Sequence, residues 1–181
     1  MNRVFWVSAA AFVVLAGCAQ TQRAADTTLA AAKAQVNPTL STSDAAFMTT
    51  AARGGMAEVE MGQLAQRNGR SPAVKRFGQQ MVSHHGRSNQ DMVALAQQKQ
   101  ITPPSSIGAE HQSVYDDLAK LRGNAFDRAY AQAMVRDHQE DLRLYQEEAA
   151  NGTDPDVRAF AARHVPILQD HLRMAQRLPQ R

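Results

Sequence analysis

Two stretches of the sequence, NGRSPAVKRF at Asn68–Phe77 and NGTDPDVRAF at Asn151–Phe160, share one pattern. Each opens with Asn-Gly, a pair that commonly ends a helix with a residue in the left-handed conformation. Ser71 or Asp154 follows as a candidate N-cap, and the next residue is proline, which is favoured at the first position of a helix. Each stretch therefore predicts a tight turn between two antiparallel helices, so the chain contains two helical hairpins.

Apolar residues on either side of these turns recur at steps of three and four positions from Ser43 onward, and no stretch alternates as a strand would. The spacing predicts long helices over residues 43–67, 72–99, 125–150 and 155–177. A Pro-rich segment at 101–106 and a short helix over 109–121 lie between the hairpins. This is the connectivity of an all-α, ferritin-like four-helix bundle, with two helical hairpins joined by a long crossover that contains a short helix. An up-down bundle with a looped-out insert is the alternative topology.

The N-terminus has the features of a bacterial lipoprotein signal. A positive start at Met1–Arg3 precedes an apolar run at Val4–Leu15 that is short for a membrane span. The run ends in Leu15-Ala16-Gly17-Cys18, which resembles a lipobox and implies cleavage before Cys18 and acylation of its thiol. We therefore expect a lipoprotein signal peptide at 1–17, the lipidated Cys18 and a flexible tether at 18–42, and the bundle domain at 43–178. An ordinary signal peptide cut nearby is the alternative.

The residue after the lipobox and the charge balance indicate location and partners. Ala19, rather than aspartate, follows Cys18, which by analogy with bacterial lipoproteins favours the outer membrane, with the bundle on its periplasmic side. The lipid on Cys18 would make the membrane a partner. Cys18 is the only cysteine, so a chain lipidated there has no free thiol, which excludes a disulfide framework, a cysteine-based zinc site and a thiol nucleophile. The 20 basic and 17 acidic side chains are interspersed without a basic stripe, so no nucleic-acid partner is expected, and protein partners stay open.

Helical projection places one metal-capable side chain from each long helix on the apolar face of that helix. Their heights along the helices put all of them near the midplane of a bundle, and they are Glu58, His85, His138 and His171. Neutral imidazoles with one carboxylate are good ligands for a divalent cation, so the pattern predicts a site for copper or zinc. The side chains in reserve are His84, His164, Met81 and Met134. The thioethers of the two methionines favour copper.

A structural interpretation of the same side chains stands beside this one. A single inward histidine is commonly a hydrogen-bonded core residue, and methionines commonly fill gaps in an apolar core. The charged run at 136–143 is interpreted mostly as a solvated face of its helix.

Several motifs occur together between Ser43 and Leu178, among them Glu58-Val-Glu60-Met-Gly62, Val74-Lys-Arg-Phe77, Met134-Val135 with His138, and His171-Leu172. In combination they resemble the bacterial envelope family known as domain of unknown function 4142. The resemblance implies a ferritin-like helical bundle and no established activity. The family usually has Met-Val-x-Asp-His, and the Met81-Val-Ser-His84-His85 found here instead looks like the Met-x-x-His-His of ferritin-like periplasmic proteins associated with copper.

No catalytic constellation is found in the sequence. It offers no Ser/His/Asp order, phosphate-binding loop or paired-carboxylate site, and it lacks the Glu-x-x-His pairs of di-iron proteins. We therefore expect a non-enzymatic, periplasm-facing outer-membrane lipoprotein that binds a metal ion at the bundle midplane. The alternative is a structural, adapter or stress-related envelope protein that binds protein partners and holds no metal.

Overall fold

The computed structural model describes residues 40–179, and all the regular secondary structure in this part of the chain is helical. Its helices are α2 (Thr42–Asn68), α3 (Pro72–Gln98), α4 (Gly108–Ala119), α5 (Gly123–Asn151) and α6 (Pro155–Gln176). None of these helices is long and apolar enough to cross a membrane. The predicted all-helical class is therefore confirmed for the described residues, whereas the signal peptide at 1–17, Cys18 and most of the tether lie outside them.

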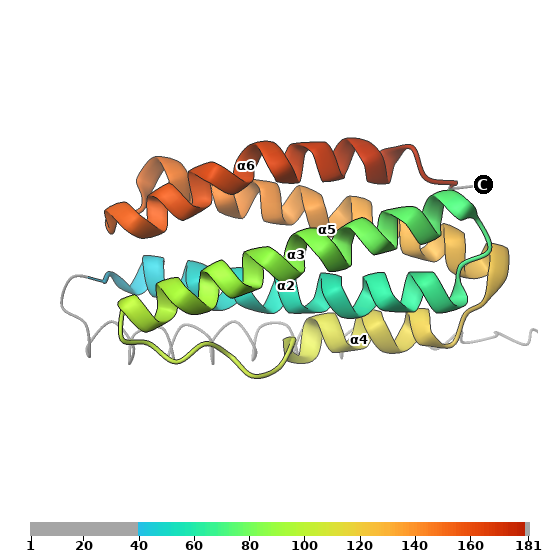
Figure 1. Ribbon diagram of the computed structural model, residues 1–181, viewed down its shortest axis with the longest axis horizontal. Coiled ribbons are helices and arrows are strands. Elements are labelled where there is room, and N and C mark those ends of the chain that lie inside the picture. Colours follow the sequence, from blue (N-terminus) through green and yellow to red (C-terminus); the bar gives the residue numbers. More distant parts are fainter. Residues whose placement is uncertain (1–39, 180–181) are drawn as a thin grey trace, which may run out of the picture.

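The long helices form two antiparallel hairpins, α2–α3 and α5–α6, whose turns lie at opposite ends of the molecule (Figure 1). Across the hairpins, α2 packs against α5 and α3 packs against α6. The segment after α3 runs back along the outside and leads into α4, which packs on α2 and α5 (Figure 1). The connection between the hairpins thus contains the short helix that the sequence predicts.

The start of α2 is tied to the turn of the other hairpin. Ser41 is the N-cap of α2 and forms a capping box with Asp44, while Leu40, inside the stretch predicted as tether, is buried. Asp44 also accepts hydrogen bonds from the backbone N–H groups of Thr153 and Asp154, at 2.9 and 3.1 Å. The carboxylate therefore holds the α5–α6 turn against the first turn of α2.

The start of α5 makes the corresponding contact with the first hairpin. Asp127 accepts hydrogen bonds from the backbone N–H groups of Arg70 and Ser71, at 3.0 and 2.8 Å, in the α2–α3 turn. Asp44 and Asp127 are separated in sequence by the same interval as the two Asn-Gly pairs. Each hairpin thus clamps the turn of the other, which fixes how the two hairpins are aligned lengthwise.

The two glycines of the turns are required by space, and not by a left-handed backbone. Gly69 has φ −66° and ψ 147°, and Gly152 has φ −57° and ψ 147°, so both are extended. A Cβ at Gly69 would lie 2.6 Å from the carbonyl oxygen of Ala65, and one at Gly152 would lie 2.7 Å from that of Glu148. The predicted turns are therefore in the right place, but the left-handed conformation expected for them is wrong.

Helices α2 and α3 approach each other closely at another pair of glycines. A Cβ at Gly62 would lie 2.6 Å from the carbonyl oxygen of Gly78, and a Cβ at Gly78 would lie 2.6 Å from that of Gly62. This contact brings the two backbones together one helical turn from Glu58 and two turns from His85. Both side chains are therefore directed into a narrow interior.

The apolar core is divided into two clusters. One, near the α5–α6 turn, includes Phe47, Tyr145 and Phe160, and the other, near the α2–α3 turn, includes Phe77 and Tyr130. Ionisable side chains occupy the interior between these clusters. The fold therefore encloses a polar layer between two apolar ends.

Replacing Asp44 by alanine removes the acceptor for two turn amides, so we expect the free energy of unfolding to fall by roughly 2–3 kcal/mol at neutral pH. Glu60→Ala is the matched control, because Glu60 is an exposed acidic residue on the same helix. Urea unfolding followed by circular dichroism measures both variants. Equal stabilities of the two variants would contradict the clamping role of Asp44.

The same carboxyl predicts a dependence on acid. Burial acts to raise the pKa of Asp44, but hydrogen bonds from Thr153 and Ser41 lower it from 3.8 to about 2. A carboxyl with a lowered pKa in the folded state stabilises the fold above its unfolded pKa, and this contribution is lost as the pH falls. Wild type should lose it between about pH 4 and pH 2, whereas Asp44→Ala should show no corresponding loss.

Candidate metal centre

The four side chains predicted as ligands meet in the polar layer, one from each long helix. Glu58 and His138 are 0% exposed, His171 is 1% exposed and His85 is 7% exposed. Glu58 Oε2 lies 2.5 Å from His85 Nε2, and Glu58 Oε1 lies 3.0 Å from His138 Nε2. His85 Nε2 lies 3.2 Å from His171 Nδ1. One ring nitrogen from each of these three histidines lies within 4.8 Å of the others, so the imidazoles surround a common point.

The position of the proton on His138 decides which of its two nitrogens has a lone pair facing the cluster. His138 Nδ1 lies 2.8 Å from the carbonyl oxygen of Met134, so Nδ1 must carry the proton and donate it there. Its Nε2 therefore carries a lone pair, and this lone pair faces the carboxyl of Glu58. Within residues 40–179, His138 Nε2 has no hydrogen-bond donor, and it faces Glu58 Oε1. Glu58 also lies within hydrogen-bonding reach of Asp137, and its other oxygen lies 2.5 Å from His85 Nε2. Two acceptors that face each other at 3.0 Å repel unless a proton or a cation lies between them.

Burial keeps the imidazoles in the form that binds metals. It lowers the pKa of His85 to about 4, and burial with the neighbouring histidines lowers the pKa of His171 to about 2. Burial also lowers the pKa of His138, although Glu58 acts against this. The pKa of Glu58 itself is raised, because burial outweighs the effect of His138. The three histidines are therefore neutral at neutral pH, as metal ligation requires.

The two reserve histidines lie at the edge of the cluster, along the groove between α3 and α6. This groove has a volume of about 690 Å³. His84 Nδ1 lies 2.8 Å from His171 Nε2, so His84 contacts one candidate ligand from the outside. His164 donates from Nδ1 to the carbonyl oxygen of Phe160 at 2.8 Å, and its Nε2 lies 3.0 Å from Ser88 Oγ. Both nitrogens of His164 thus have local partners, whereas His171 is the histidine of α6 that lies in the cluster with His85 and His138.

The reserve methionines pack in the apolar cluster near the α2–α3 turn. Met81 and Met134 are both 0% exposed and belong to that cluster. The carbonyl oxygen of Met134 also orients His138. The structure thus gives both side chains a packing role, and ligation by their sulfur atoms stays a prediction.

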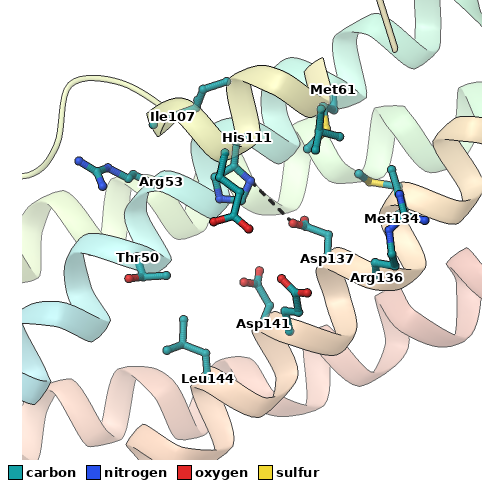
Figure 2. A pocket seen from close by; sticks show the side chains of 15 residues that line it. Thr50, Arg53, Met61, Ile107, His111, Met134, Arg136, Asp137, Asp141 and Leu144 are labelled. Atoms are coloured by element: carbon teal, nitrogen blue, oxygen red, sulfur yellow. Dashed lines mark ion pairs between the residues drawn. The ribbon is translucent and has the colours of Figure 1, made fainter. Parts of the chain in front are cut away.

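Two acidic side chains that the sequence analysis placed on a solvated face point into the molecule. Asp137 and Asp141 line a cavity of about 430 Å³ between α2, α4 and α5, so that interpretation of the run at 136–143 is wrong for them (Figure 2). Asp141 occupies space left by Gly54, where a Cβ would lie 3.4 Å from Asp141 Oδ1. The signal in the sequence is the spacing of one helical turn between the two aspartates, which lie on either side of His138.

Asp137 joins Glu58 and His138 in a second group of metal-capable atoms that lie within 4.8 Å of one another. Burial, and after it the nearby Glu58, raise the pKa of Asp137 to about 8. On the cavity side, Asp137 Oδ1 lies 3.8 Å from His111 Nδ1 (Figure 2). The polar layer therefore has a histidine side and an acidic side, with Glu58 between them.

Comparison with known proteins places the chain among helical domains without an assigned activity. The model of the family described as Domain of unknown function (DUF4142) matches residues 29–178. No curated protein matches the chain. A DUF305 protein from Streptomyces coelicolor, whose name calls it a candidate secreted protein, is similar in structure at 15% identity and TM-score 0.63, over 74% of this chain and 88% of that one. A DUF305 fragment from Deinococcus radiodurans is similar at 14% identity and TM-score 0.67, over 76% of this chain and 95% of that one. At these identities the likeness concerns the fold alone.

The lowered pKa of His85 predicts how the metal-free fold responds to pH. Between pH 6.5 and about 4 the unfolded chain binds a proton at this histidine and the folded chain does not, so the free energy of unfolding falls as the pH falls. His85→Gln removes this contribution, and its stability should decline less steeply than that of wild type, by about 1.4 kcal/mol per pH unit at most.

Urea unfolding in the presence of a chelator, at several pH values across this window, measures the two slopes. A loss of packing in His85→Gln shifts its curve by the same amount at every pH, so the slope reports the titration of His85 and of the neighbours that its charge affects. Parallel curves for wild type and His85→Gln would show that His85 titrates alike in both states.

Proposed function

The chain belongs to the family of unknown function DUF4142, and we propose that it is a periplasm-facing outer-membrane lipoprotein whose ferritin-like helical bundle binds a copper or zinc ion. The observation that carries the proposal is the approach of His138 Nε2 to Glu58 Oε1 at 3.0 Å. Since Nδ1 of His138 holds its proton at the carbonyl of Met134, a cation between the two acceptors removes their repulsion.

The spacing of the donor atoms suits a small divalent ion. Bonds of 2.0–2.1 Å in a tetrahedral site place neighbouring donor atoms about 3.3 Å apart. The separations of 3.0 Å between Glu58 Oε1 and His138 Nε2 and of 3.2 Å between His85 Nε2 and His171 Nδ1 are close to this value. The 2.5 Å between Glu58 Oε2 and His85 Nε2 is shorter, so these two groups would move apart around an ion. The hydrogen bond from His138 Nδ1 to a backbone carbonyl is the kind of outer contact that orients a metal-bound imidazole. Small side-chain shifts would therefore complete a site with three nitrogen donors and one oxygen donor.

The donor set narrows the choice of ion. Imidazole ligands suit zinc and copper, and copper binds more tightly than zinc to a given site of this kind. His84, which reaches the cluster through His171 from the α3–α6 groove, offers a further imidazole along the route to solvent. Both features favour copper where both ions are available.

The cellular setting is proposed from the N-terminal sequence and the architecture. Cys18 in its lipobox would anchor the chain, and the residues before Leu40 would link the lipid to the helical domain. The name of the Streptomyces coelicolor neighbour supports a location outside the cytoplasm. Two hairpins joined by a long crossover, with inward ligands from all four long helices, support the ferritin-like assignment.

One observation favours a second candidate, a structural or adapter protein with a satisfied polar core and no metal. Since burial raises the pKa of Glu58, a protonated Glu58 can donate a hydrogen bond to His138 Nε2. His84, His171 and His85 already form a chain of hydrogen bonds. A proton would then lie between the two acceptors in place of the metal ion. The metal content of the purified protein separates this adapter function from metal binding.

We expect the purified full chain to retain copper or zinc after dialysis, and the double variant His85→Ala with His138→Ala to retain none. The matched control is His111→Ala with His164→Ala, which also removes two histidines but leaves the four ligands in place. Elemental analysis measures the metal content of the three proteins. Equal, trivial contents in wild type and both variants would favour the adapter function instead.

Thermal unfolding gives an independent readout of the same site. An ion present at a thousand times its dissociation constant adds about 4 kcal/mol of stability, which raises the melting temperature of a domain of this size by roughly 10 °C. Chelator should remove this increment from wild type and from the control variant. A melting temperature that chelator leaves unchanged would argue against a bound ion.

A further inference from the structure

The acidic side of the polar layer has the features of a second cation position. Glu58, Asp137 and His138 offer one ligand atom each within 4.8 Å of one another. Asp137 Oδ2 is buried and has no hydrogen-bond partner in the described part of the chain. Glu58 is completely buried, lies within hydrogen-bonding reach of Asp137, and has one oxygen 2.5 Å from His85 Nε2. Two carboxyl groups held this close in a buried place are stabilised when a proton or a cation lies between them.

Glu58 is the side chain that can serve both sides at once. His138 offers a single lone pair, because its other nitrogen donates to Met134, so it can bind one ion only. Glu58 has two oxygens. Oε2 lies 2.5 Å from His85 Nε2 on the histidine side, and Glu58 also offers a ligand atom within 4.8 Å of one from Asp137 on the acidic side. A carboxylate in such a position can hold one ion with each oxygen, and bridged ions of this type lie about 3.5–4 Å apart.

We propose that Glu58 bridges two divalent cations, one on the histidine side with His85, His138 and His171, and one on the acidic side with Asp137. The proposal rests on the proposed function for the first ion and adds a second. Carboxylate and water ligands suit cations that prefer oxygen donors, such as Mn²⁺, so the two positions should differ in the ions they select.

The cavity beside Asp137 has the size and charge for a partly hydrated ion. It measures about 430 Å³, which is room for several waters at about 30 Å³ each. Glu110, Glu140 and Asp141 line it together with Asp137, while Arg53, Arg136 and the facing His111 are its other ionisable lining residues (Figure 2). Carboxyl groups therefore dominate its wall, and water can complete the coordination of an ion held by Glu58 and Asp137.

The two positions open in different directions. The acidic side faces the cavity between α2, α4 and α5, whereas His85 and His171 line the groove between α3 and α6. Each ion could therefore enter and leave without displacing the other.

The stoichiometry of zinc binding tests the proposal, because Zn²⁺ accepts both imidazole and carboxylate ligands. We expect the full chain to bind two equivalents, Asp137→Asn to bind one, and the control Glu140→Gln to bind two. Glu140 is an exposed acidic residue that lines the same cavity from the same helix. Circular dichroism verifies that both variants, each an exchange of carboxyl for amide, remain folded.

A single equivalent in wild type that Asp137→Asn retains would overturn the second position and leave the proposed function intact, since Glu58 and Asp137 would then share a proton. No bound zinc in wild type would overturn both. A loss of both equivalents in folded Asp137→Asn would show one joint site in place of two positions.

Electron paramagnetic resonance on wild type tests the bridge without any variant. The chain is first loaded with one equivalent of Cu²⁺, whose signal should show nitrogen ligation, and Mn²⁺ is then added. A Mn²⁺ ion on the other oxygen of Glu58 should broaden or abolish the Cu²⁺ signal. An unchanged Cu²⁺ signal with bound Mn²⁺ would place the second ion elsewhere and overturn the proposal.

Discussion

The structure depends on one buried contact, the carboxyl of Glu58 facing a lone pair of His138 at 3.0 Å. A buried carboxylate with no compensating charge costs several kcal/mol, and a facing acceptor adds to that cost. The interior accommodates it because the polar groups are confined to one layer, with an apolar cluster toward each end of the molecule. Those clusters supply the burial energy that holds four ionisable side chains from four helices at one level.

The height at which these four side chains meet is fixed by contacts at the ends of the helices. Asp44 and Asp127 each bind the backbone of the opposite hairpin turn, so neither hairpin can slide along the other without breaking charge-assisted hydrogen bonds. The interval that separates these two aspartates also separates Glu58 from Asp141. At the same interval, the counterparts of His85, His138 and His171 are Leu168, Gly55 and Ser88. The two hairpins thus share their scaffold, whereas the histidines belong to one half of the repeat only, and the cluster is asymmetric within a nearly symmetric frame.

The features that depend on one helix at a time could be predicted from the sequence. Periodicity located the helices of the hairpins. The apolar faces of these helices predicted that the interior contains Glu58, His85, His138 and His171, and all four are buried. The predictions that proved wrong concern contacts with other parts of the chain, which a projection of a single helix does not show. Asp137 looked solvated because its face of α5 is polar, but α4 from the crossover covers that face and encloses it. Gly69 and Gly152 were expected to be left-handed, but a close carbonyl oxygen, which only the packed turn reveals, explains the glycines.

The crossover is therefore part of the site and not only a connection. Without α4, the carboxyl of Asp137 would lie in water, which would satisfy it and screen it from Glu58. With α4 in place, the donors change across the interior from imidazole nitrogen, next to the α3–α6 groove, to carboxylate oxygen, next to the cavity between α2, α4 and α5. Under the proposed function, ions that prefer nitrogen and ions that prefer oxygen would bind to different oxygens of the same buried glutamate. The position of one short helix decides whether the acidic face is a solvated surface or a buried place beside Glu58, where we propose the second cation.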